Sequence, residues 1–167
     1  VNADTLREML AVHPGLFRGY GEIGLYEREE GAPALAPDSQ RLLDIYPLIK
    51  ENNLVVYFHP GEGQEDNLEK VLKQYPDLQF IVHGEQIEDE IDSLMSKYPN
   101  IYFTANDLYG DQYLLHPGEN VESFLAATKN YEPLLQKDLN TWKILIERHP
   151  DQFLWGTDRG GIAVWTL

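Results

Sequence analysis

The 167-residue chain contains no cysteine. A disulfide framework and any metal site with thiolate ligands are therefore excluded, because both need cysteine side chains. If the protein binds a metal ion, its side-chain ligands must be histidine, aspartate or glutamate. The absence of cysteine leaves the redox compartment undetermined.

Basic residues are few. The 13 lysines and arginines are outnumbered by 28 aspartates and glutamates, which gives a formal net charge of -15 at pH 7. This charge would repel nucleic-acid backbones and anionic membrane surfaces, and the sequence has no basic stripe to offset it. We therefore expect a small-molecule substrate, and neither nucleic acid nor a membrane as partner.

Long apolar runs are also missing. No run approaches the roughly 18 residues that indicate a membrane span. The N-terminal segment VNADTLREML lacks the basic and then apolar layout of a signal peptide. We expect a cytoplasmic protein. Because the segment has no initiating methionine, we also expect the sequence to be a processed product or an excerpt of a longer chain.

The sequence does contain a repeated unit. Four segments run from an aromatic residue or histidine and a proline, through an apolar stretch, to a polar residue: HPGLFRGYGE, YPDLQFIVHG, YPNIYFTAND and HPDQFLWGTD. A fifth copy, NNLVVYFHPG, begins with two asparagines instead. Apolar stretches without alternation are typical of strands buried on both faces. The polar residues that end them are Glu22, His59, His83, Asn106 and Asp158.

Apolar residues at helical spacing occupy the intervals between these strands. We predict that helices begin at Ser39 and Asn67, and that each ends where an X-Pro dipeptide disfavours helical geometry or the next strand begins. Strand followed by helix, five times over, predicts one α/β domain with a parallel sheet. The helical segments are 39–51, 66–75, 87–98 and 139–149.

The five polar strand ends should lie at one edge of the sheet, where parallel α/β proteins carry their chemistry. Two histidines and an aspartate from separate strands are suitable ligands for a divalent cation with an open position for water. The alternative is structural: a strand-end histidine can bond a loop carbonyl, Asp158 can cap a turn, and Asn106 can close a turn rather than contact substrate.

Four motifs resemble a known family. GEIGLY, VVYFHPG, FIVHGE and FLWGTD are similar, in order and spacing, to strands four, five, six and eight of the amidohydrolase superfamily, the metal-dependent (β/α)8 TIM-barrel enzymes. The resemblance covers nearly the whole chain. It implies that residues 1–167 are the C-terminal portion of such a barrel, present as a partial barrel of about five βα units, because a closed barrel takes roughly 250 residues.

The resemblance also implies a ligand set. His59 and His83 would be metal ligands, and Asp158 would be both a ligand and the base that takes a proton from water. Glu22 matches a carboxylate that bridges two metal ions in the TatD-like deoxyribonuclease branch; the alternative is a structural carboxylate paired with Arg18. The expected cofactor is a divalent metal, one or two ions, with zinc favoured.

The chain departs from the superfamily in one respect. The first strand of these enzymes carries a His-x-His pair that supplies two ligands, and this sequence contains no such pair. We expect the first three βα units to lie upstream of Val1. A partial barrel would have open sheet edges, which favour association into a homo-oligomer or aggregation.

One connection is much longer than the usual βα loop of roughly 2 to 6 residues. We predict that residues 107–138 form a loop insertion over the catalytic face, where Tyr109, Tyr113 and His116 would line a substrate pocket. A locally packed helical insertion is the alternative. Arg159, next to the predicted base, would bind a substrate carboxylate or phosphate, or else form a surface ion pair.

These observations favour a metal-dependent hydrolase that acts on an ester, lactone, amide or similar bond. Three alternatives remain open. The amidohydrolase-related group of this superfamily also contains decarboxylases and hydratases of aromatic or unsaturated acids, for which Arg159 would bind the carboxylate of the substrate. Phosphodiester cleavage in the TatD style is another. The last is a truncated barrel without catalytic activity, since fold alone does not determine function.

Overall fold

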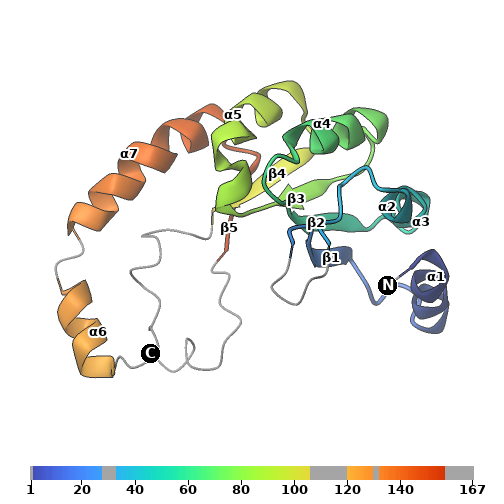
Figure 1. The fold of residues 1–167 in the computed structure, drawn as a ribbon, viewed down its shortest axis with the longest axis horizontal. Coiled ribbons are helices and arrows are strands. Elements are labelled where there is room, and N and C mark those ends of the chain that lie inside the picture. Colours follow the sequence, from blue (N-terminus) through green and yellow to red (C-terminus); the bar gives the residue numbers. More distant parts are fainter. Residues whose placement is uncertain (1, 28–32, 106–119, 130–131, 157–167) are drawn as a thin grey trace. The chain divides into compact units, whose positions relative to one another are not determined.

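A computed structural model describes residues 2–27, 33–105, 120–129 and 132–156 of the chain. The chain is α/β, and its strands form a sheet in the order β1-β2-β3-β4-β5, which is also their order in the sequence (Figure 1). The chain divides into two compact units, residues 1–104 and 105–167. The parallel sheet and its βα connections confirm the predicted α/β class, and closure into a barrel stays a prediction.

The strands of the sheet are parallel neighbours wherever their register is defined. Val56 pairs with Phe80, and Phe80 pairs with Ile101, so the apolar stretches of successive repeats lie side by side. Large apolar side chains of β2, β3 and β4 are buried in the core, as expected of the inner strands of a parallel sheet. The strands are β1 (Gly19–Gly24), β2 (Val55–His59), β3 (Phe80–Val82), β4 (Ile101–Ala105) and β5 (Phe153–Trp155).

Helices connect the strands of the first unit, and α4 and α5 lie along the same side of its strands (Figure 1). The apolar faces of α4 and α5 are buried, and each buried Leu or Ile contributes roughly 1.5–3 kcal/mol to the free energy of unfolding. The helices are α1 (Ala3–Val12), α2 (Gln40–Leu43), α3 (Tyr46–Glu51), α4 (Glu65–Gln74) and α5 (Glu88–Lys97), with a 3-10 turn η1 (Glu85–Ile87) before α5.

Two predicted helix boundaries in this unit are wrong. The single helix predicted over 39–51 is two short helices, because the chain turns at Asp44 and Ile45 and restarts with Pro47 in the first turn of α3. Helix α4 begins at Glu65 rather than at Asn67. The Asn67 side chain does not cap the helix; it donates a hydrogen bond to Asp38 at 2.7 Å.

A buried tyrosine joins α3 to the segment before α2. Tyr46 is fully buried, and its hydroxyl donates to the carbonyl oxygen of Pro37 at 2.6 Å. Its ring packs against Tyr75 and Phe80 at centroid distances of 4.9 and 5.8 Å. Burial raises the pKa of the Tyr46 hydroxyl well above its ordinary value, so this hydroxyl stays a donor.

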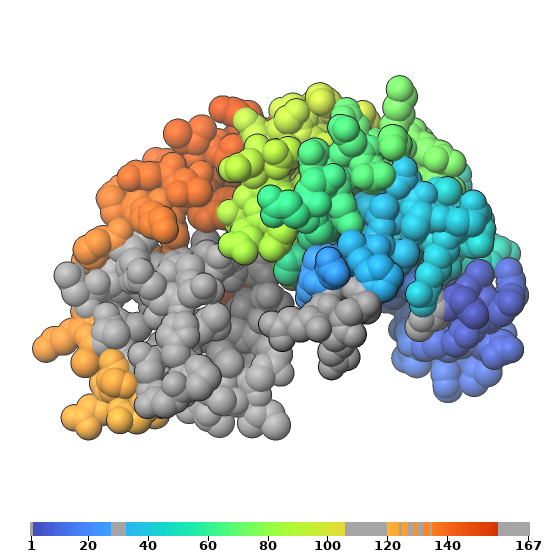
Figure 2. Space-filling view, in the orientation of Figure 1, coloured from blue at the N-terminus to red at the C-terminus, as the bar shows by residue number. Residues whose placement is uncertain are grey.

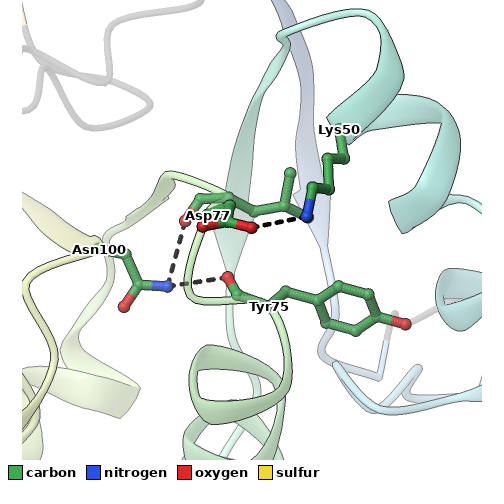
Figure 3. Close-up of polar contacts among 5 residues, drawn as sticks. Lys50, Tyr75, Asp77 and Asn100 are labelled. Atoms are coloured by element: carbon green, nitrogen blue, oxygen red, sulfur yellow. Dashed lines mark hydrogen bonds and ion pairs between the residues drawn. The ribbon is translucent and has the colours of Figure 1, made fainter.

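An asparagine organises the entry to β3. The Asn100 side-chain amide donates to the carbonyl oxygen of Tyr75 at 3.1 Å (Figure 3). It also donates to the carbonyl oxygens of Leu78 at 3.1 Å and Leu72 at 3.3 Å. It therefore links the last turn of α4 to the residues that lead into β3. Nearby, Lys50 and Asp77 form a 2.6 Å ion pair, which is exposed and adds little.

Helices α4 and α5 contact each other directly, and their surfaces are adjacent in Figure 2. Glu69 accepts hydrogen bonds from the Tyr98 hydroxyl at 2.9 Å and from Lys97 at 3.3 Å. The hydrogen bond from Tyr98, followed by that from Lys97, lowers the pKa of the Glu69 carboxyl. The two repeats are thus joined at the surface as well as through the sheet.

The second unit contains helices α6 (Val121–Thr128) and α7 (Glu132–Arg148) as well as β5. Asn120 and Ser123 form a reciprocal capping box at the start of α6. The helix predicted to begin near Leu139 begins at Glu132, and part of the predicted loop insertion over 107–138 is helical. Trp142 is buried, and its ring lies 6.3 Å from that of Phe153. Among the described helices, none has the length and apolar character that crossing a membrane requires.

Candidate metal centre

Three of the predicted metal ligands come together at one edge of the sheet. His59 is the last residue of β2, His83 directly follows β3, and Glu22 lies near the end of β1. One ligand atom from each lies within 4.8 Å of the others. We call these three residues the candidate metal centre. Their convergence from three repeats follows from the parallel arrangement, which brings equivalent strand ends together.

A β-bulge in β1 aims Glu22 at the histidines. Tyr20 pairs with Val56 and Ile23 with Phe58, so one extra residue of β1 lies between these pairs. A bulge of this kind redirects the side chains that follow it. Gly21 within the bulge has φ +142°, and a Cβ there would lie 2.8 Å from that of Tyr57, so only glycine fits.

The shortest contact joins the carboxylate to the buried histidine. The Nε2 atom of His83 lies 2.8 Å from Oε1 of Glu22, and Nδ1 of His59 lies 3.8 Å from the same oxygen. Since an ionised carboxylate only accepts hydrogen bonds, the Nε2–H group of His83 donates to it. A cation bound among the three residues would take the place of this proton.

The three side chains differ in exposure, which gives the centre one open side. The side chain of His83 is 1% exposed, that of His59 20% and that of Glu22 38%. The two imidazole rings are in edge contact at a centroid distance of 4.4 Å. Tyr57 packs against His83 at 5.1 Å and Tyr26 against His59 at 4.7 Å. The histidines are therefore held by aromatic neighbours, while the carboxylate remains accessible.

These distances fit a divalent cation. Two donor atoms that each lie about 2.1 Å from a tetrahedral zinc ion are about 3.4 Å apart. The contacts of Glu22 with His83 and His59, at 2.8 and 3.8 Å, lie on either side of that separation. Adjustments of about half an ångström would bring these two contacts to that value, and the remaining pair, one atom from each histidine, lies within 4.8 Å. Two imidazoles and one carboxylate also leave a coordination position open, as in catalytic zinc sites.

Two residues at the centre were not anticipated from the sequence. Gln86, in η1, accepts a hydrogen bond through Oε1 from Nε2 of His59 at 3.0 Å. Gly84 has φ +103°, and a Cβ there would lie 2.5 Å from the same nitrogen. Both follow His83 within three residues, in HGEQ. That proximity to a predicted ligand was the only signal in the sequence.

Two cavities adjoin these residues. One, of about 590 Å³, has Glu22 and Tyr26 in its lining together with apolar side chains of α1 and β1. The other, of about 440 Å³, is lined by Gln86 and by acidic side chains of the segments after β2 and β3. The acidic residues are Glu62, Glu65, Glu85, Asp89 and Glu90. The surroundings of the centre thus carry strong negative charge on one side.

The structure describes three of the predicted site residues, Glu22, His59 and His83. These three residues lie together as predicted, and the carboxylate of Glu22 contacts both histidines. Its role as a metal ligand, against that of a structural carboxylate, stays a prediction. The other predicted site residues lie outside the described part of the chain, so their roles stay predictions: Asp158 as base and ligand, and Asn106, Tyr109, Tyr113, His116 and Arg159 as substrate contacts.

Comparison with known proteins finds no family model, no curated protein and no solved structure that matches this chain.

Proposed function

We propose that this protein is a metal-dependent hydrolase of small molecules, in which Glu22, His59 and His83 hold a divalent cation. One observation supports this above the others: the three ligand atoms lie within 4.8 Å of one another at the carboxyl ends of successive parallel strands. That edge of a parallel sheet is where α/β proteins bind ligands. The resemblance of the surrounding motifs to the amidohydrolase superfamily points to the same chemistry.

Zinc is the cation that we propose. Imidazole nitrogens and carboxylate oxygens are its usual ligands when cysteine is absent, and a His2Glu set is known in catalytic zinc sites. When bound, such an ion lowers the pKa of a coordinated water to roughly 7 and polarises a carbonyl group. The protein's contribution is to hold the two imidazoles in a fixed orientation, with Glu22 on the accessible side.

The proposed reaction is attack of water on an ester, lactone, amide or similar carbonyl. Asp158, which ends the last repeat along the chain, HPDQFLWGTD, is proposed to accept the proton that the attacking water loses. Neighbouring Arg159 is proposed to bind an anionic group of the substrate. The formal charge of -15 argues against a nucleic-acid substrate, because phosphates would be repelled.

Zinc binding by the metal-depleted protein, measured by isothermal titration calorimetry, tests the proposed centre. We expect His83→Asn and Glu22→Gln each to lower the affinity at least roughly 10-fold, because each removes a ligand or its charge. His13→Asn is the matched control, since His13 is exposed and precedes β1 at the other end of the strand. Equal affinity for wild type and both site variants would overturn the assignment.

Turnover of a panel of chromogenic esters and lactones tests the hydrolase step. We expect zinc-dependent hydrolysis by the wild-type protein and its loss in Asp158→Asn, assayed at a zinc concentration that saturates each protein. If zinc binds at the three residues and every ester and lactone is left intact, the site is a metal site and the hydrolase assignment is wrong.

A further inference from the structure

We propose that Gln86 is a positioning residue that sets the tautomer of His59, so that the Nδ1 lone pair of His59 faces Glu22 and the cation. The proposal concerns the same centre, and its functional part rests on the proposed function. The tautomer of His59 is nevertheless a property of the metal-free protein and can be measured without zinc.

The orientation of the Gln86 amide is defined by two contacts. Its Oε1 lies 3.0 Å from Nε2 of His59, and its Nε2 lies 3.5 Å from a carboxylate oxygen of Glu85. A carboxylate accepts and does not donate, so the NH2 group of the amide turns toward Glu85 and the carbonyl group toward His59. The position of Gln86 is fixed by its neighbour Ile87, which is fully buried.

This orientation determines which ring nitrogen of His59 carries the proton. A neutral imidazole has one N–H donor and one lone pair, and an amide carbonyl can only accept. The Nε2 atom of His59 must therefore be the donor, which leaves the lone pair on Nδ1. Nδ1 is the atom that lies 3.8 Å from Oε1 of Glu22. Metal-binding histidines commonly have their other nitrogen bonded to an acceptor in this way.

Glu22 is the other polar neighbour of the His59 ring, but its Oε1 lies 3.8 Å from Nδ1, which is beyond hydrogen-bond distance. The aromatic neighbours hold the ring in place without choosing between its nitrogens. The Tyr26 and His83 rings are in edge contact with it at 4.7 and 4.4 Å. Gly84 leaves room for the ring, because a Cβ there would lie 2.5 Å from Nε2. Neither an edge contact between rings nor a glycine supplies an acceptor for Nε2–H. Gln86 is the acceptor that the described contacts give this group.

The test compares Gln86→Leu, which removes the acceptor, with Gln86→Glu, which keeps one. Nitrogen-15 chemical shifts of the His59 ring identify its tautomer, measured on metal-free protein at a pH of about 8.5, where imidazole is ordinarily neutral. We expect the Nε2–H tautomer in wild type and in Gln86→Glu, and a mixture of tautomers in Gln86→Leu. Gln74→Leu, on the exposed surface of α4, is the matched control and should resemble wild type.

Zinc affinity gives the functional readout on the same proteins. We expect Gln86→Leu to weaken zinc binding roughly 10- to 100-fold, the usual effect of removing such a partner, and Gln86→Glu to retain most of it. The positioning role is overturned if Gln86→Leu keeps a pure Nε2–H tautomer. If wild type binds no zinc while the tautomer shifts as expected, the proposed function falls and the positioning role stands.

Discussion

Replacing Gly84 by alanine tests how closely the candidate metal centre is packed. A Cβ at this position would lie 2.5 Å from Nε2 and 2.8 Å from Cδ2 of His59, whereas ordinary van der Waals contact begins at 3.4 Å. The imidazole would have to withdraw by 3.4 - 2.5 = 0.9 Å. That displacement is enough to break the 3.0 Å hydrogen bond to Gln86 and to misplace Nδ1.

The expected cost of Gly84→Ala has two parts. A side chain at φ +103° strains the backbone by about 1–3 kcal/mol. Crowding against the His59 ring adds about 1–3 kcal/mol, as in overpacked cores. We expect the free energy of unfolding in urea to fall by the sum of the two. Zinc affinity should also fall, because the ring is displaced.

Gly63→Ala separates the two parts. Gly63 has φ +68°, and a Cβ there would meet nothing within 4 Å, so this variant carries backbone strain alone. We expect it to be less destabilised than Gly84→Ala and to bind zinc like wild type. If the two variants unfold at the same urea concentration and bind zinc equally, the packing argument for His59 is refuted.

Two further predictions concern the scaffold. Asn100→Ala should lower the free energy of unfolding by about 1–3 kcal/mol, because three carbonyl oxygens lose their side-chain donor. Asn100→Asp, which has the same shape but no NH2 group, should be no more stable than Asn100→Ala. Wild-type stability in both variants would contradict this account. The pKa of the Glu69 carboxyl is lower in the folded protein than in the unfolded chain. Glu69 therefore stabilises the fold fully at a pH above its unfolded-state pKa, and this stabilisation is lost as the pH falls through its folded-state pKa. The difference in urea midpoint between wild type and Glu69→Gln should therefore shrink between pH 6 and roughly pH 3, and a constant difference would show that ionisation of Glu69 is irrelevant.

The order of strands could be predicted because each repeat marks its own ends. The X-Pro dipeptides stop a helix and the apolar stretches that follow form strands, as the register of Val56, Phe80 and Ile101 confirms. The first and last residues of the helices were harder to predict from the sequence. Asn67, expected to start a helix, lies inside α4 and bonds Asp38, 29 positions earlier in the sequence, a contact that local propensity does not contain.

The candidate metal centre could be predicted for the same geometric reason. Parallel strands end at one edge, so Glu22, His59 and His83 were expected together before any distance was known. The contribution of Gln86 could not be foreseen, because it depends on the path of the chain after β3. A contact between residues 59 and 86 requires both the strand pairing and the turn at Gly84.

The acidic cavity beside Gln86 has a consequence for how fast ions arrive. Carboxylates from the segments after β2 and β3 share its lining, so their fields add over the same small volume. A potential of this sign concentrates divalent cations near the protein and speeds diffusional capture, within a screening length of about 8–10 Å at physiological salt. The same field slows the approach of anions. Uptake of a cation by this protein should accordingly become slower as ionic strength rises, even where the affinity of the ligands themselves is unchanged.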